Sequence, residues 1–88
     1  MAEQIKTTGS EVLAQYINPG DFDDCGKTGV YRCLGLSASN APTSHPYGTL
    51  VVFQCSSDSS YTVQLFITRS NPVKLYIRLR TYPWVEVV

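Results

Sequence analysis

Histidine and clustered carboxylates are the side chains of this chain that could carry out chemistry. The single histidine, His45, lies between Ser44 and Pro46, with no acidic residue or cysteine nearby in the sequence. A Cys–His nucleophile pair needs a third group that orients the imidazole, and the sequence offers no such group. We therefore interpret His45 as a solvated loop residue and expect no catalytic residue in this chain.

Asp21, Asp23 and Asp24 form an acidic cluster. Their spacing resembles the start of a calcium-binding loop, but the later glycine and the bidentate glutamate of such a loop are missing. Turn formation and capping of a helical turn are the favoured interpretation. The cluster therefore does not predict a metal site.

The chain has three cysteines, Cys25, Cys33 and Cys55. An odd number at irregular spacing argues against a disulfide framework. Cys33 and Cys55 lie in apolar, strand-like runs, so we expect buried free thiols there. No C-x-x-C pair occurs, so we expect no zinc, and the sequence predicts no other cofactor.

Aromatic and cationic side chains are the strongest chemical signal. The chain has six tyrosines and one tryptophan. Aromatic rings stack on sugars, and arginine binds carboxylate or phosphate groups. Tyrosine also simply fills strand positions, and charges keep a strand face soluble. Both interpretations stay open for Tyr76, Arg78 and Arg80, whereas Tyr31 and Trp84 are expected to pack. The formal net charge is zero, which does not favour nucleic-acid binding.

Alternation of apolar and polar residues predicts the strands that must position these groups. Short turn clusters separate the strands, as in an antiparallel meander. In the segment 73–80 the residues Val73, Leu75, Ile77 and Leu79 share one face. Lys74, Tyr76, Arg78 and Arg80 share the other, which we expect to be the outer, solvated face. The expected strands are Val30–Leu36, Thr49–Cys55, Tyr61–Thr68, Val73–Arg80 and a short one around Trp84–Val87.

Before the strands, residues 1–20 are expected to form an N-terminal tail with a short helix or turn, and residues 21–88 a β-structured domain. A helix over Gly9–Ile17 would have Ser10 as its N-cap and Val12, Leu13 and Tyr16 on one face. The predicted fold class is all-β: a small antiparallel β-sandwich or meander with a short N-terminal helix or turn.

Self-association is suggested by the strand 49–55, which is apolar on both faces at Leu50–Phe53. Such a strand must be covered on both sides, and a single small sheet covers only one. A neutral chain is also prone to associate. Copies of the same chain could supply the second cover, as could a loop or the N-terminal segment.

From Gly20 onward the chain carries a series of short motifs: Gly20–Asp24 with Gly29–Tyr31 (D-L-N-D … G-x-Y), Asn40–Pro42 (N-x-P), Gly48–Val52 (G-x-L-x-V), Tyr61–Leu65 (Y-x-x-Q) and Leu75–Arg78 with Trp84–Val87 (I-Y-x-R … W-x-x-L/V). In order and approximate spacing, from about Asp21 onward, these motifs resemble the C-terminal knob or tip domains of bacteriophage tail fibre (receptor-binding) proteins. One departure is Tyr82, which stands near Trp84 where the family often has two tryptophans. The family's metal-binding His-x-His repeats have no counterpart here, so the resemblance implies no metal.

The resemblance implies a non-enzymatic adhesion or structural module of a virion. Such domains are usually homotrimers of small β-folds that contact a host-surface glycan or protein, or a neighbouring virion protein. The implied location is a tail or surface fibre, after synthesis in the bacterial cytoplasm without a signal peptide. We expect neither nucleic-acid binding nor insertion into a membrane.

Binding residues are expected in the loops at the sheet ends and on the basic strand face. In a trimer, Gln64 near the axis could bond to its symmetry mates and fix the register. Candidate receptor-binding residues are His45, Tyr47, Tyr61, Lys74, Tyr76, Arg78 and Arg80; candidate interface residues are Val12, Leu13, Tyr16, Gln64 and Phe66.

Two alternatives belong to other functional classes. A fibre-borne polysaccharide depolymerase would need paired carboxylates, and the β region offers only Asp58 and Glu86. A small carbohydrate-binding module would act as a monomer, so the oligomeric state separates it from a fibre tip.

Overall fold

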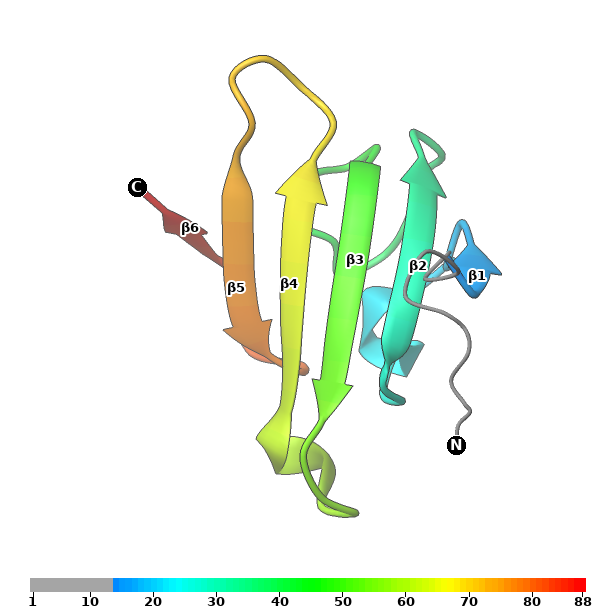
Figure 1. Ribbon diagram of the computed structural model, residues 1–88, viewed down its shortest axis with the longest axis vertical. Coiled ribbons are helices and arrows are strands. Elements are labelled where there is room, and N and C mark those ends of the chain that lie inside the picture. The colour runs from blue at the N-terminus through cyan, green and yellow to red at the C-terminus, as the bar shows by residue number, and fades with distance from the viewer. Residues whose placement is uncertain (1–13) are drawn as a thin grey trace, which may run out of the picture.

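The computed structural model describes residues 14–88, apart from the side chain of Ser59, and this part of the chain is mostly β. Six strands form one mixed sheet whose spatial order follows the chain order (Figure 1). β1 pairs with β2 in parallel and all other neighbours are antiparallel, and the sheet is not closed. The strands are β1 (Tyr16–Ile17), β2 (Gly29–Leu34), β3 (Tyr47–Gln54), β4 (Thr62–Thr68), β5 (Leu75–Leu79) and β6 (Val85–Val87).

The predicted antiparallel meander is therefore confirmed for β2 to β6. The expected N-terminal helix is wrong where the structure describes it, because Tyr16–Ile17 is a strand; Gly9–Leu13 lie outside the described residues. Gln15 and Asn18 explain the strand, since the Gln15 side chain accepts from Val30 N (3.2 Å) and that of Asn18 from Leu34 N (2.8 Å). The helical turns among residues 14–88 are two 3-10 turns, η2 (Phe22–Asp24) and η3 (Ser59–Tyr61).

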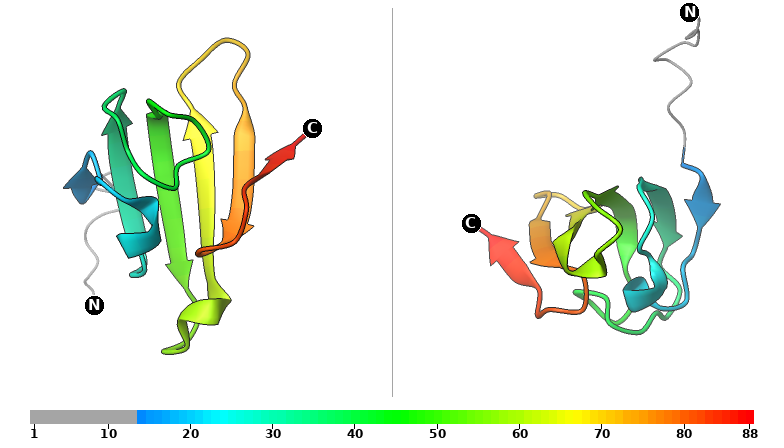
Figure 2. Two further views of the ribbon diagram at one scale, coloured as in Figure 1. Left: turned by 180° about the vertical axis from the view of Figure 1, so that it is seen from behind. Right: turned by 90° about the horizontal axis from the view of Figure 1, so that it is seen from below.

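One face of the sheet is covered by η2 and the loop 35–46, which cross in front of the strands when the molecule is seen from behind (Figure 2, left). Phe22, from η2, is completely buried at the centre of this layer. Ala38, Ala41, Tyr76 and Trp84 pack around the core as partly buried residues. The core consists of Phe22, Cys25, Tyr31, Cys33, Leu50, Val52 and Phe66, so the expected packing of Tyr31 and Trp84 is confirmed.

Backbone hydrogen bonds hold the covering layer in place. Ser39 N donates to Gly20 O (3.0 Å), and Phe22 N donates to Ser39 O (3.0 Å), which ties the start of η2 to the loop. Gly35 has φ +84°, a conformation that glycine adopts without strain, and its N–H donates to Pro46 O (2.9 Å). The loop therefore leaves β2 and returns to β3 with its two ends bonded together.

The opposite face of the sheet is open, because no described segment crosses it (Figure 1). The described chain thus forms a single sheet with one cover. The predicted alternation in 73–80 is correct, but the assignment of its two faces is wrong: Tyr76 and Arg78 point to the covered side. Leu75, Ile77 and Leu79 consequently point to the open side, because successive strand residues alternate.

Candidate functional site

The open face of the sheet is dominated by apolar side chains over β4, β5 and β6. Cross-strand pairing places them side by side: Leu65 is opposite Ile77, which is opposite Val85. Phe53, Ile77, Leu79, Val85 and Val87 are between 37% and 59% exposed. We name this surface the apolar patch; it comprises Val51, Phe53, Val63, Leu65, Leu75, Ile77, Leu79, Val85 and Val87.

The apolar patch is large for so small a chain. At roughly 150–200 Å² of accessible surface for a whole large side chain, its open area is on the order of 500 Å². The whole described surface is 5536 Å². A shallow groove of about 450 Å³ runs through the patch between Val63, Leu79 and Val85. The largest apolar patch of a monomeric protein is typically about 300–600 Å² and is often functional, so this patch is a candidate interaction site.

A second groove of about 700 Å³ lies on the same face over β2, β3 and the end of β4. Its floor is Thr49, which pairs with Arg32 on one side and Ile67 on the other. A short side chain therefore stands between two longer ones and leaves a depression. Tyr47 and Arg69 lie at one end. We name this surface the basic groove; its lining also includes Val30, Leu34, Thr68, Ser70 and Val73.

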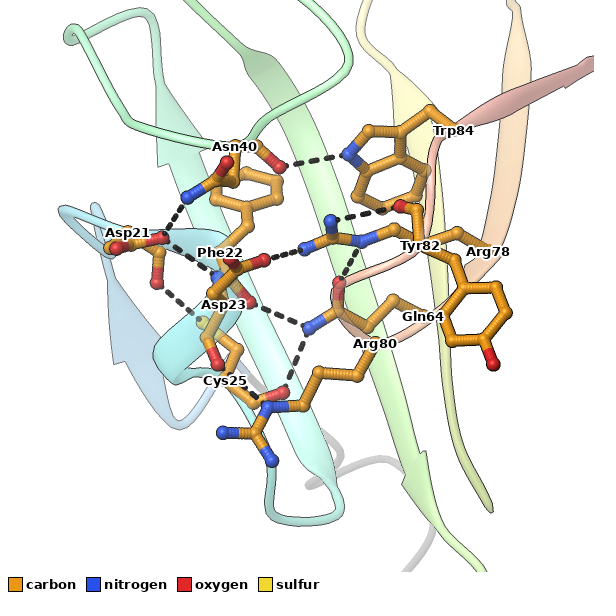
Figure 3. Close-up of polar contacts among 10 residues, drawn as sticks. All are labelled: Asp21, Phe22, Asp23, Cys25, Asn40, Gln64, Arg78, Arg80, Tyr82 and Trp84. Atoms are coloured by element: carbon orange, nitrogen blue, oxygen red, sulfur yellow. Dashed lines mark hydrogen bonds and ion pairs between the residues drawn. The ribbon is translucent and has the colours of Figure 1, made fainter. Parts of the chain in front are cut away.

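On the covered face, a buried polar cluster joins η2 to the sheet (Figure 3). Gln64 is completely buried, and its amide donates to Phe22 O (2.7 Å) and Cys25 O (2.8 Å). Its Oε1 accepts from Arg78 Nε (2.7 Å). The backbone carbonyls of η2 thus find partners in the interior, which a wholly apolar strand face could not supply.

Arg78 is the centre of this cluster (Figure 3). It forms an ion pair with Asp23 (3.0 Å) and donates to Tyr82 O (3.2 Å). Its guanidinium lies 4.6 Å from the centre of the Trp84 ring, a cation–π contact. Burial lowers the pKa of Arg78 from its usual value, and the Asp23 carboxylate opposes that shift. A buried arginine with these partners fixes η2 and the 82–84 segment against β5.

The loop 35–46 is attached to the same cluster through Asn40. Trp84 Nε1 donates to Asn40 O (2.8 Å), and Asn40 Nδ2 donates to Asp21 Oδ1 (2.9 Å). Asp21 also caps η2 by accepting from Asp23 N (2.9 Å). The hydrogen bonds from Asn40 and Asp23 hold the pKa of Asp21 below its usual range. The predicted capping role of the acidic cluster is therefore confirmed for Asp21.

Two of the cysteines are core residues. Cys25 and Cys33 are buried, and burial raises the pKa of each thiol to about 11. Burial likewise raises the pKa of Tyr31 to about 12. Thiols of this kind are unreactive at neutral pH. All three cysteines are free, but the prediction for Cys55 is wrong: it is exposed, because it follows the last residue of β3.

The candidate receptor-binding residues do not form one site. His45 is exposed in the loop 35–46, Tyr47 lies on the open face, and Tyr61 is 60% exposed in η3, beyond the other end of β3. Lys74 is exposed in the turn between β4 and β5. Of these four, only Tyr47 lines the basic groove.

The remaining receptor-binding candidates belong to the covered layer, which corrects the expectation of a cationic outer face. Tyr76 packs against the core and Arg78 is buried. Arg80 is half-buried and donates from Nε to Asp23 O (2.6 Å). All three contact the covering layer, and Arg78 is buried while Tyr76 and Arg80 are half-buried.

Two interface candidates are corrected for the same reason. Gln64 and Phe66 are both fully buried within one chain, and the hydrogen bonds of Gln64 end on its own chain. Tyr16 is 46% exposed and stacks on Tyr31 with ring centres 4.7 Å apart. Val12 and Leu13 lie outside the described residues.

Sequence reasoning missed the apolar patch, Arg32 and Arg69. Alternation did place Leu75, Ile77 and Leu79, three residues of the patch, on one strand face, but as the inner face. Arg32 alternates with Tyr31 and Cys33 along β2, and this pattern could have placed it on the strand face opposite theirs. Within residues 14–88, no group of three or more His, Cys, Asp or Glu side chains could hold a metal ion, and no helix is long and apolar enough to cross a membrane.

Comparison with known proteins adds no relative. No protein-family model, no curated protein and no solved structure matches this chain.

Proposed function

We propose that this chain is an adhesion or structural module of a virion, of the type found at the tip of a bacteriophage tail fibre, and that it acts as a homotrimer. The observation that carries the proposal is the apolar patch on an otherwise well-organised sheet. The motif series from Asp21 onward supports the same class of protein. The host ligand is a cell-surface glycan or protein, and neighbouring virion proteins are further partners.

The size of the apolar patch supports association of identical copies. Each partner in a standard protein interface contributes about 800 Å², and the patch supplies on the order of 500 Å² of apolar centre to which a polar rim adds. Three copies around an axis bring three patches together, which would complete a β-sandwich-like core between chains. The second cover that β3 and β4 require would then come from the oligomer.

The rigid covering layer supports a binding role for the rest of the surface. Asn40, Trp84 and Arg78 hold the loop 35–46 in one conformation through bonds to the buried polar cluster. A loop that is already ordered loses little entropy when a ligand binds. In the proposed trimer this loop and the basic groove stay at the surface.

The depolymerase hypothesis has less support. Hydrogen bonds from Ser60 hold the pKa of Asp58 below its usual range, whereas the acid of a glycosidase pair needs a raised pKa. Glu86 belongs to β6, at the edge of the sheet, and no observation joins it to Asp58.

Sedimentation equilibrium of the full chain tests the oligomer. We expect a mass near three times 9.8 kDa. Ile77→Asp places a charge in the middle of the apolar patch and should give a folded monomer. Leu36→Asp is the matched control, because Leu36 is 60% exposed in the loop 35–46 and should leave the trimer intact. A wild-type monomer at all concentrations would contradict the proposal and favour the monomeric carbohydrate-binding module.

Adhesion is tested by incubating the fluorescently labelled full chain with intact cells of a panel of bacteria. We expect retention on a subset of strains after washing, and loss of retention after extraction of surface glycan or protease treatment of the cells. Retention on every strain alike, or on none, would count against adhesion to a host.

A further inference from the structure

The basic groove combines a ligand-sized depression with positive charge that no acidic side chain of residues 14–88 neutralises. Its volume of about 700 Å³ lies within the roughly 300–1,000 Å³ of small-molecule sites. Two of its lining residues are arginines, Arg32 and Arg69. No described residue that lines the groove is acidic. The acidic residues of the described chain lie elsewhere: Asp21, Asp23 and Asp24 in and beside η2, Asp58 before η3, and Glu86 in β6.

Arg69 is held in place by Tyr47 from a neighbouring strand. Its guanidinium carbon lies 5.3 Å from the centre of the Tyr47 ring, and Nη1 is 3.5 Å from the Tyr47 hydroxyl. Arg69 N also donates to Tyr47 O (2.7 Å). These contacts position the cation without neutralising it, because a tyrosine carries no charge at neutral pH. Among residues 14–88, no acidic side chain forms an ion pair with Arg69 or Arg32.

The walls of the groove divide into a polar and an apolar part. Thr49 offers a hydroxyl group, whereas Val30, Leu34 and Ile67 offer apolar surface. An anionic sugar has the complementary chemistry: one charged substituent, several hydroxyls and a ring with apolar C–H faces. Arginine binds carboxylate and phosphate in a bidentate manner, and ring contacts with apolar and aromatic side chains orient a sugar.

We infer that the basic groove binds an anionic sugar of a surface glycan, with its carboxylate or phosphate on Arg69 and Arg32 and its ring along the wall formed by Leu34 and Ile67. This inference rests on the proposed function, because the proposed function supplies the host cell surface from which the glycan comes. It assigns the charged substituent, and not an aromatic platform, as the feature that selects the ligand.

Two-dimensional NMR of the ¹⁵N-labelled full chain tests the inference. The probes are glucuronic acid, N-acetylneuraminic acid and glucose 6-phosphate, with glucose and the methyl ester of glucuronic acid as uncharged controls. We expect at least one anionic probe to shift the amides of Thr49, Thr68 and Arg69, and the uncharged controls to shift none. The carboxylate and phosphate arms separate the two possible sources of charge.

Matched variants assign the charge to the groove. Arg32→Met and Arg69→Met should each weaken binding about tenfold, and Arg69→Lys should weaken it less because charge is kept while the bidentate geometry is lost. Lys27→Met removes an exposed cation that lies outside the groove and should leave the affinity unchanged. The amide spectrum of each variant reports whether it is folded.

Contrary outcomes are distinguishable from failure of the proposed function. The inference would be overturned if the anionic probes shifted no amide, or only amides outside the groove. It would also be overturned if glucose bound equally well, or if the affinity survived both arginine substitutions. Sedimentation of the same samples reports the oligomer independently. If the chain is a trimer that binds no anion, the proposed adhesion module stands and the ligand site in the basic groove is wrong. If the chain is a monomer that binds the anion through Arg32 and Arg69, the ligand site stands and the proposed fibre tip is wrong.

Discussion

Over β4 and β5, the two faces of this sheet depart from the usual distribution of polar and apolar side chains. On the covered face of β4 and β5, Gln64 and Arg78 lie in the interior next to Phe66. On the open face the same strands present Leu65, Ile77 and other residues of the apolar patch. The difference has a physical cause: the covering layer is a 3-10 turn and a loop, whose carbonyl groups need donors. A helix or second sheet would satisfy its own backbone and would accept an apolar face.

The comparison also separates two tasks. The covered face stabilises one conformation of a single chain, through a small apolar core and a fully connected polar cluster. The open face contributes little to that chain and is available to others. Substitutions on the two faces should therefore affect different measurements: unfolding free energy for the covered face, assembly or ligand binding for the open one.

The largest expected effect is on the covered face, at Phe22. Phe22→Ala should lower the free energy of unfolding by about 3–5 kcal/mol, because Phe22 is completely buried and contacts Phe66 and Trp84 with ring centres 5.8 and 6.2 Å away. Ile77→Ala on the open face should cost the monomer less than about 1 kcal/mol. Urea unfolding at a concentration where both chains are monomeric measures the two values. Equal losses would mean that the faces do not differ in this way.

The next largest effect concerns the polar cluster. Gln64→Leu should destabilise the chain by about 2–3 kcal/mol, because it leaves the carbonyls of Phe22 and Cys25 and the Nε of Arg78 without their partner. The loss should appear as reduced stability of the monomer and not as a changed oligomeric state. If Gln64→Leu kept its stability but altered the assembly, the side chain would belong to a subunit interface after all.

Coupling within the cluster sharpens the same test. Gln64→Leu and Arg78→Met should be strongly non-additive, since the two side chains share a hydrogen bond of 2.7 Å. Arg69→Met on the open face is the matched arginine control and should combine additively with Gln64→Leu. Chemical denaturation of the single and double variants gives the coupling energy.

A smaller effect is expected at low pH from the cap of η2. The pKa of Asp21 is lowered by hydrogen bonds from Asn40 and Asp23. The unfolded chain therefore binds a proton more readily, and the stabilisation by Asp21 is present above its ordinary pKa and is lost as the pH falls through the lower, folded value. Asp21→Asn keeps an oxygen acceptor at the cap and cannot titrate. The stability of wild type and variant should differ at pH 6 and converge toward pH 2; a constant difference would contradict the role of the charge.

The smallest effect is expected at Thr62, on the covered face. Thr62 Oγ1 is buried and has no hydrogen-bond partner among the described residues. Thr62→Val has nearly the same shape and removes the unpaired hydroxyl, so it should raise the free energy of unfolding by up to about 1 kcal/mol. Thermal unfolding measures it. A clear loss of stability would show that the hydroxyl is satisfied in solution.

Much of the local structure follows from the sequence itself. Alternation located β2 to β6 within a few residues, and turn residues such as Asn71 and Pro72 located the connections. Alternation also sorted the side chains of β5 into two sets correctly. It could not assign the sets to inside and outside, because that depends on what lies over each face.

The sequence by itself determined β2 to β6, the turns between them and which residues share a strand face, because these depend on neighbours along the chain. Only the tertiary structure decided that Gln64 and Arg78 are interior, that Arg32 and Arg69 line one groove with Thr49, and that the apolar patch is open. Each of these depends on contacts between segments far apart in the sequence, and above all on the hydrogen-bonding needs of η2 and the loop 35–46 that cover one face.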